Sequence, residues 1–249
     1  MDNTTYIALS RQMALWNQLE VVSNNLANMK TAGFKGTDTL FANYVFKLDQ
    51  NDRTFKDKVA FVHDFGLVRN LSQGVFEFTG NTFDLALRGE GYFVTRGRGG
   101  VETYTRAGNF AISSEGNLVT MEGRLVLGRN GAPINIPSDA KDIVVRGDGT
   151  ITEEGGRNFG QLRVVRFENE RELKQVDGTG FISEGEPAID LQPPEVGQGV
   201  LEASNVNPVI EMTRLISLNR AYQDNARMIQ QEDDRKRRAN EVFTRQITA

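Results

Sequence analysis

Apolar residues recur every three or four positions near both ends of the chain. Near the start, with the polar Gln12 counted in the row, the repeating positions are Ala8, Leu15, Leu19, Val22, Leu26 and Met29. Near the end they are Leu215, Leu218, Tyr222, Ala226 and Ile229. This spacing predicts two amphipathic helices, each with one apolar face that another helix must cover. The first helix is expected from about residue 4 to 28, and the second from about residue 208, after an Asn207 cap, to about residue 242.

Between these ends the pattern changes to short strands and tight turns. Residues 101–106 alternate with period two and contain several β-forming residues. Turn dipeptides then follow at short intervals: Glu115-Gly116, Glu122-Gly123, Asn130-Gly131, Asp148-Gly149 and Asp177-Gly178. Asn-Gly and Asp-Gly are typical of hairpin turns, so the middle of the chain is expected to be an antiparallel sandwich or barrel-like domain.

The predicted fold class is therefore α+β, with long N- and C-terminal helices forming a coiled-coil-like pair and a central antiparallel β-rich domain. Four segments are expected. They are an N-terminal helix over residues 1–33, an irregular or partly extended connector over 34–72, the β-rich domain over 73–202 and a C-terminal helix over 203–249.

One short pattern occurs twice, at both borders of the β-rich region. Residues 73–77 read Gln-Gly-Val-Phe-Glu, and residues 198–202 read Gln-Gly-Val-Leu-Glu. We expect these two segments to run side by side as a neck between the β-rich domain and the helical pair. Two unrelated strand starts are the alternative.

Composition narrows the class of protein. The formal net charge of -4 offers no broad attraction to nucleic acid, and the lack of cysteine excludes disulfides and thiolate ligands. No apolar run approaches the roughly 18 to 20 residues that cross a bilayer, so membrane insertion is not expected. The first residues lack the pattern of a signal peptide, so any export is expected to need a dedicated machine.

Signals for chemistry are weak. His63 is the single histidine and has no metal-binding spacing around it, while Gly89-Glu90-Gly91 precedes a strand rather than a helix. The Arg96–Gly100 run is interpreted as a solvated hairpin loop, and Arg235–Arg238 as a solvated helix face rather than a nucleic-acid site. No catalytic residue, metal site or cofactor is therefore predicted.

Asparagine is frequent in the first helix, although it lowers helix propensity. The positions are Asn17, Asn24, Asn25 and Asn28. Exposure at a fraying end is one explanation. We favour a second one, in which the amides bond to neighbouring subunits, because an amide both donates and accepts.

Three stretches resemble one known family. Residues 23–35 (SNNLANMKTAGFK) form the first, and residues 79–87 (TGNTFDLAL), 91–94 (GYFV) and 104–110 (YTRAGNF) the second. Residues 201–209 (LEASNVNPV) and 219–225 (NRAYQDN) form the third. Together they resemble the bacterial flagellar axial proteins, the rod, hook and hook-associated subunits. The beginning of the chain is most similar to proximal rod subunits, with distal rod subunits as the nearest competitor.

This resemblance implies a structural role without enzymatic activity. Subunits of this family are exported unfolded by the flagellar type III apparatus and stack helically in the periplasmic rod, which transmits torque. The implied partners are other rod subunits, copies of the chain itself and, in transit, the export machinery. The expected interface residues are Leu15, Leu19, Val22, Asn24, Asn25, Leu26, Asn28, Leu215, Leu218, Tyr222, Ala226 and Ile229.

Two other classes remain open from the residues alone. An extracellular carbohydrate-binding or adhesive β-module would explain the turn-rich middle, but not the apolar rows at the ends. A hydrolase on a β scaffold would need a cleft with an isolated pair of carboxylates.

Overall fold

The computed structural model describes residues 2–47, 58–97 and 99–247. The chain divides into two compact units. We call the first the helical unit, which comprises Met1–Leu26, Thr37–Val68 and Asn207–Ala249. The second, the β unit, comprises Ala27–Gly36 and Arg69–Val206.

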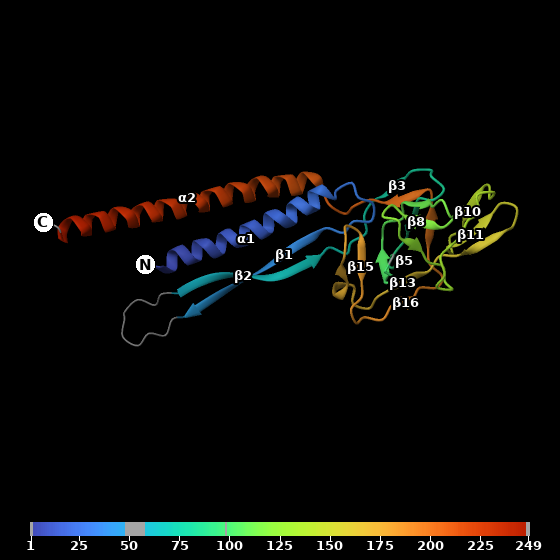
Figure 1. Ribbon diagram of the computed structural model, residues 1–249, viewed down its shortest axis with the longest axis horizontal. Helices are drawn as coiled ribbons and strands as arrows, with labels where there is room; N and C mark the ends of the chain where they lie inside the picture. Colours follow the sequence, from blue (N-terminus) through green and yellow to red (C-terminus); the bar gives the residue numbers. More distant parts are fainter. Residues whose placement is uncertain (1, 48–57, 98, 248–249) are drawn as a thin grey trace. The chain divides into compact units, whose positions relative to one another are not determined.

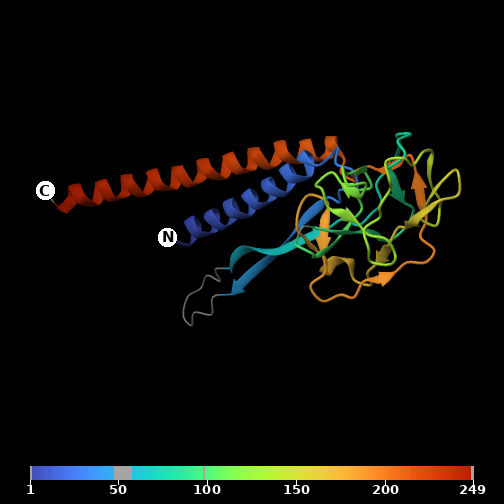
Figure 2. The same ribbon diagram turned by 45° about the vertical axis from the view of Figure 1, so that its right-hand side comes forward.

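In its described residues, the helical unit contains two helices and one strand pair. Helix α1 spans Asp2–Ala27 and helix α2 spans Pro208–Ile247. Strands β1 (Thr37–Lys47) and β2 (Lys58–Arg69) pair with each other within the segment expected to be a connector. Figures 1 and 2 both show this pair running alongside α1. The two helices expected from the apolar spacing are thus present.

The start of α2 is fixed by the cap that the sequence predicts. The Asn207 side-chain oxygen accepts hydrogen bonds from the backbone N–H groups of Val209 (3.1 Å) and Ile210 (3.4 Å). These are two of the N–H groups that have no partner inside the helix. We expect Asn207→Ala to lower the free energy of unfolding by about 1 kcal/mol, measured by urea denaturation. An Asn207→Gly variant, which loses only a few tenths of a kcal/mol at such positions, is the control.

The prediction of a long coiled-coil-like helix pair is wrong. There is one helix at each end, and they differ in length, with 26 residues in α1 and 40 in α2. Asn225 of α2 donates to the carbonyl of Ala8 in α1, so most of the second half of α2 continues beyond the start of α1. Polar Asn25, Glu211 and Asn225 are buried between the elements, where a coiled coil would repeat apolar residues.

The β unit is built from short strands. A nine-stranded sheet has the path β14-β15-β6-β5-β9-β8-β7, with β13 on β5 and β16 on β13. A three-stranded sheet, β10-β11-β12, and two strand pairs, β17-β4 and β18-β3, accompany it. The bounds are β3 Phe76–Phe78, β4 Leu85–Leu87, β5 Tyr92–Arg96, β6 Glu102–Thr105, β7 Phe110–Ile112, β8 Leu118–Thr120, β9 Leu125–Val126, β10 Ile143–Val145, β11 Thr150–Glu153, β12 Asn158–Gln161, β13 Val164–Arg166, β14 Lys174–Gln175, β15 Gly180–Ile182, β16 Ile189–Asp190, β17 Val196–Gln198 and β18 Val200–Glu202.

Antiparallel pairing in the β unit follows the turn signals. The Glu122-Gly123 turn connects β8 to β9, and Asp148-Gly149 connects β10 to β11. Gly123 and Gly149 adopt φ values of 78° and 80°, which side chains with a Cβ disfavour. Strands β5 and β6 pair up to Arg96 opposite Glu102, so Arg96 ends β5 and the hairpin connection follows it, with Arg98 outside the described residues.

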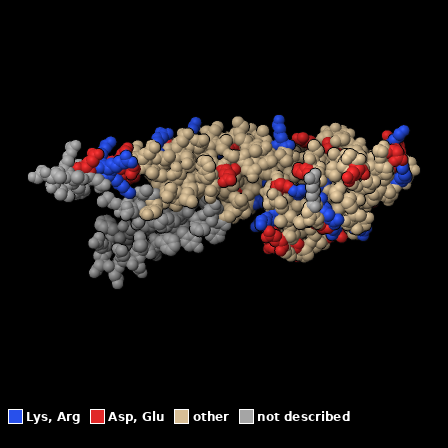
Figure 3. Space-filling model, viewed as in Figure 1, with Lys and Arg blue, Asp and Glu red and all other residues tan. Residues whose placement is uncertain are grey.

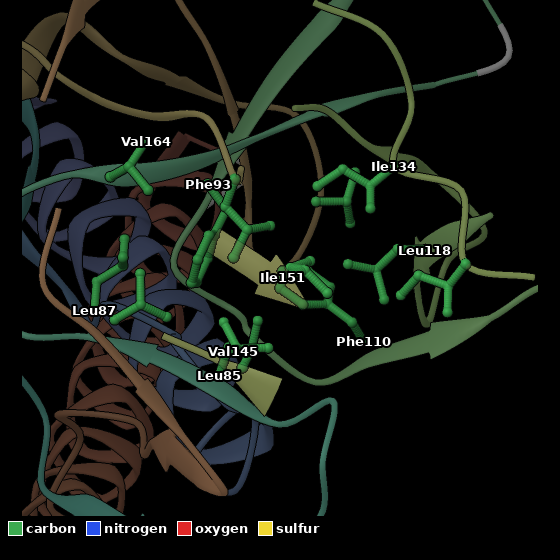
Figure 4. Packing of buried hydrophobic residues seen from close by; sticks show 13 residues of the cluster. Leu85, Leu87, Phe93, Phe110, Leu118, Ile134, Val145, Ile151 and Val164 are labelled. Carbon is green, nitrogen blue, oxygen red and sulfur yellow. The ribbon is translucent and has the colours of Figure 1, made fainter. Parts of the chain in front are cut away.

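Two apolar clusters fill the β unit. Figure 4 shows the larger one, in which Phe93, Phe110 and Leu118 pack with Ile151 and Val164. The rings of Phe93 and Phe110 meet edge to face at 5.2 Å. The second cluster gathers Tyr92, Tyr104, Phe167 and Phe181 elsewhere in the same unit. The β unit therefore has a hydrophobic core of its own.

The repeated Gln-Gly-Val pattern does mark neighbouring strands. Val200 pairs with Phe78, Leu201 with Glu77 and Glu202 with Phe76 in an antiparallel register. The expectation that the two segments run side by side is confirmed.

Candidate subunit interface

The expected interface positions on α1 lie largely on its covered side. Leu15 and Val22 are buried, with 9% and 7% of their surface exposed, while Leu19 and Leu26 are half-buried. On α2, all of Leu215, Leu218, Tyr222, Ala226 and Ile229 are half-buried. The ring of Tyr222 lies 6.0 Å from that of Trp16 in α1. A large part of this apolar row is therefore covered within the subunit, and its contact with neighbours stays a prediction.

A second apolar row on α1 is exposed. Tyr6, Leu9, Met13 and Trp16 have 64%, 49%, 63% and 59% of their surface accessible. Their spacings of three, four and three place them on one face. At about 100° per residue, this face is rotated by about 120° from the row that contains Leu15 and Val22. We call it the exposed α1 row.

Helix α2 carries a corresponding row near its start. Val209, Met212 and Ile216 are 72%, 52% and 53% exposed and follow the spacings three and four. We call them the exposed α2 row. In Figure 3 much of the surface over the two helices is uncharged, and charged side chains gather toward the far end of α2. Apolar side chains that recur in rows on a face of this kind are typical of a surface that another protein covers.

Asn25 has a role inside the subunit. Its side-chain oxygen accepts from the backbone N–H of Thr37 (3.0 Å), and its amide nitrogen donates to the Thr37 carbonyl (2.9 Å) and to Glu211 (3.4 Å). Arg214 in turn donates to Glu211 and to Asp38, each at 3.0 Å. The Asn25 side-chain amide thus bonds both the N–H and the C=O of Thr37, as the backbone of a neighbouring strand would. Through Asn25 and Glu211, the start of β1 is connected to both helices.

Two neighbouring asparagines, Asn24 in α1 and Asn28 just after it, differ from Asn25. Asn24 is exposed and Asn28 half-buried, and the Asn28 side-chain oxygen accepts from the Thr31 hydroxyl at 3.2 Å. Their expected bonds to neighbouring subunits stay a prediction.

We expect Asn25→Ala to lower the free energy of unfolding of the helical unit by about 1 to 3 kcal/mol, because the Thr37 N–H and C=O would lose a buried partner. Chemical denaturation followed by circular dichroism at the helical signal measures this. The matched control is Ser23→Ala, at an exposed position of the same helix. It should change the free energy of unfolding by less than about 0.5 kcal/mol. Equal effects of the two substitutions would contradict the role given to Asn25.

A buried ion cluster lies in the β unit. The Lys35 ammonium donates to one Glu202 carboxylate oxygen at 2.5 Å, and the Arg106 guanidinium lies 3.5 Å from the other. The backbone N–H of Gly74 also donates to Glu202, at 3.0 Å. Burial lowers the pKa of Lys35, an effect that the Glu202 carboxylate opposes. All three charged residues are more than nine-tenths buried.

Close backbone packing surrounds this cluster. The Gly33 N–H donates to the Glu202 carbonyl at 2.7 Å. Gly33 has φ +68°, and an added Cβ would lie 2.4 Å from the backbone nitrogen of Ala107. Lys35, Arg106 and Glu202 come from the three stretches that carry the family resemblance. The motifs therefore meet at one place, although they are far apart in the sequence.

Other candidate chemistry adds little. His63 lies in β2, and its side chain is outside the part that the structure describes. A cleft of about 680 Å³ is lined by Glu168 and Glu170 together with Arg106, Arg166 and Arg171. Glu170 accepts a hydrogen bond from the Tyr92 hydroxyl at 2.9 Å.

Within residues 2–47, 58–97 and 99–247, no three His, Cys, Asp or Glu side chains gather as a metal ion would need. Neither described helix combines the length and apolar character of a bilayer span.

Exposed apolar rows on the terminal helices, together with a β unit that has its own core, are typical of a structural subunit whose helices another protein covers. Comparison with known families agrees with this class. Residues 6–35 match the flagella basal body rod protein family, and residues 86–153 match the D1 domain of the flagellar hook protein FlgE/F/G. Residues 198–242 match the C-terminal region of the flagellar basal body rod FlgEFG proteins.

Individual relatives extend the similarity over nearly the whole chain. The flagellar basal-body rod protein FlgF of Caulobacter vibrioides is 38% identical over 246 residues, covering 97% of this chain and 98% of the relative. FlgF of Mesorhizobium japonicum is 31% identical, with 93% of each chain covered. The flagellar basal-body rod protein FlgG of Agrobacterium fabrum is 34% identical over 92% of this chain and 94% of its own length.

The chain belongs to the flagellar basal-body rod proteins of the FlgE/F/G family. It is accordingly a structural component of the flagellar basal-body rod, and the resemblance noted in the sequence is confirmed. Relatives named FlgF and relatives named FlgG both match, so the two remain the close alternatives within the family.

Proposed function

We propose that the chain is a non-enzymatic subunit of the proximal rod, exported by the flagellar type III apparatus and stacked helically into a torque-transmitting shaft. Its neighbours in this proposal are other proximal and distal rod subunits and copies of itself. A distal position, as for subunits of the FlgG type, is the alternative.

The exposed α1 row is the observation that carries the proposal. Four large apolar side chains on one helix face stay accessible in the single chain. Covering each of them contributes on the order of 1.5 to 3 kcal/mol. A repeated contact of this kind between identical or related chains offsets the entropy of ordering long helices.

The proposal assigns different roles to the segments of the chain. Residues 1–33 and 203–249 form the polymerisation core, residues 34–72 connect it to the rest, and residues 73–202 form an outer domain. The proposed interface combines the exposed rows with the half-buried positions of α2, Leu215, Leu218, Tyr222, Ala226 and Ile229.

Complementation tests this role. A strain that lacks the gene would receive either the full chain or a chain without residues 2–17, which removes the exposed α1 row and leaves the β unit unchanged. We expect only the full chain to restore swimming. Immunoblots of secreted and basal-body fractions separate a failure of export from a failure of assembly. Normal swimming with the shortened chain would contradict the proposal.

A further inference from the structure

A groove on the helical unit lies between α1, α2 and β1. It encloses about 230 Å³. Val21 and Val22 of α1 and Leu218 of α2 supply its apolar lining, and Asp38, Arg214 and Ser217 are among its polar lining residues. The groove therefore offers an apolar interior with a polar rim, large enough to receive a bulky side chain.

The rim of this groove is held in place. Arg214 donates to Asp38 of β1 and to Glu211 of its own helix, each at 3.0 Å. The Ser217 hydroxyl donates to the Arg214 carbonyl at 2.8 Å, so it is turned back onto its own helix. A cavity whose walls are fixed before binding loses less entropy when it is filled.

The exposed rows lie on the other side of both helices. At about 100° per residue, the exposed α1 row is rotated by about 150° from Val21 and Val22 around α1. By the same measure, the exposed α2 row is rotated by about 160° from Arg214, Ser217 and Leu218 around α2. Each helix thus presents apolar side chains on one face and one wall of the groove on nearly the opposite face.

We infer that the groove receives side chains of the exposed α1 row, Met13 and its neighbours, from a second copy of this chain. This inference rests on the proposed function and makes it specific. Because the row and the groove lie on different faces, each copy that fills a groove leaves its own groove open. Such a heterologous contact continues from copy to copy and does not close into a two-fold dimer.

Disulfide trapping tests the pairing, because the natural chain has no cysteine. One preparation of the full chain carries Met13→Cys, and another, with a mass tag, carries Leu218→Cys. After mixing and mild oxidation, every disulfide is between chains. We expect the 13–218 heterodimer to form at least about tenfold faster than the product of Leu218→Cys with Met121→Cys, since docking raises the effective concentration of the paired thiols. Met121 is 69% exposed and lies in the β unit. Equal rates would overturn the inference.

Filling the groove provides a second test. Ser217→Phe places a ring where the incoming side chain would lie, and Ser114→Phe makes the same change at an exposed turn of the β unit. In sedimentation velocity we expect Ser217→Phe to weaken self-association at least about tenfold relative to Ser114→Phe, with unchanged circular dichroism. Unchanged association, or a natural chain that stays monomeric at every concentration, would overturn the inference.

The two levels of the proposal fail differently. Loss of swimming after removal of the exposed α1 row, together with normal self-association of Ser217→Phe, rejects the groove and leaves the rod function standing. Normal swimming without that row rejects the assembly role that the proposed function assigns to it.

Discussion

Glu202→Gln is expected to destabilise the β unit by about 3 to 5 kcal/mol, because it leaves two buried cations without their anion. Lys35 and Arg106 both face Glu202, and water has little access to any of the three side chains. For a unit of this size, such a loss corresponds to a fall of roughly 10 °C in the midpoint of thermal unfolding. Differential scanning calorimetry of the full chain measures it.

Two further variants test whether the loss of stability comes from unpaired buried charges or from the Glu→Gln change itself. Glu122→Gln makes the same change at an exposed turn and should leave the midpoint unaltered. Adding Lys35→Met to Glu202→Gln should recover part of the loss, since one unpaired cation disappears. If Glu202→Gln unfolded at the same temperature as Glu122→Gln, the cluster would have no structural role.

Replacing Leu9 and Met13 together by glutamate should prevent incorporation into the rod while the chain still folds. Both side chains are already exposed, at 49% and 63%, so the single chain loses little. In the assembly the change removes on the order of 3 to 6 kcal/mol of apolar burial, which corresponds to a factor above 100 in affinity. Immunoblots of isolated basal bodies and swim plates give the readout.

The control for this double variant is Met121→Glu, which places a carboxylate at a 69% exposed position of the β unit. We expect it to be incorporated normally. Motility of the Leu9/Met13 variant equal to that of the control would show that the exposed α1 row is not an assembly surface.

Local patterns were sufficient to predict part of this fold. The periodicity of three and four located both helices, and Asn207 located the start of α2 because its cap involves only the next three residues. The turns at Gly123 and Gly149 likewise depend on backbone preferences of one or two residues. Such short-range features depend on a few adjacent residues, so they can be predicted without knowing the rest of the fold.

Apart from the pairing of β3 with β18, long-range features are not predicted by the sequence. Strands β1 and β2 mix aromatic and polar residues without a clean period, so their pairing was not recognised. The helix pair was misjudged because nothing local shows that Asn25 and Glu211 fill the space between the elements. Lys35 and Glu202 are 167 positions apart, and no spacing rule connects them.

Unlike these long-range contacts, the exposed α1 row has a local signal in the sequence. Tyr6, Leu9, Met13 and Trp16 follow the same three-and-four rule as the row around Leu15. The two rows differ in that one is covered within the chain and the other is exposed, and the spacing alone does not distinguish them. A helix that is apolar on two faces can pack within its own chain and against another chain at once.

The contact between α1 and α2 also has a consequence for the order of events when the chain folds. Asn25 meets Glu211 across 186 positions, and Asn225 meets the Ala8 carbonyl across 217. Closing loops of this size is slow compared with forming the local hairpins of the β unit. A polypeptide that emerges from a narrow conduit beginning with residue 1 cannot complete its helical unit until nearly the last residue has come through. During the proposed export, connectivity therefore delays the formation of the helical unit and of the polymerisation surface proposed on it.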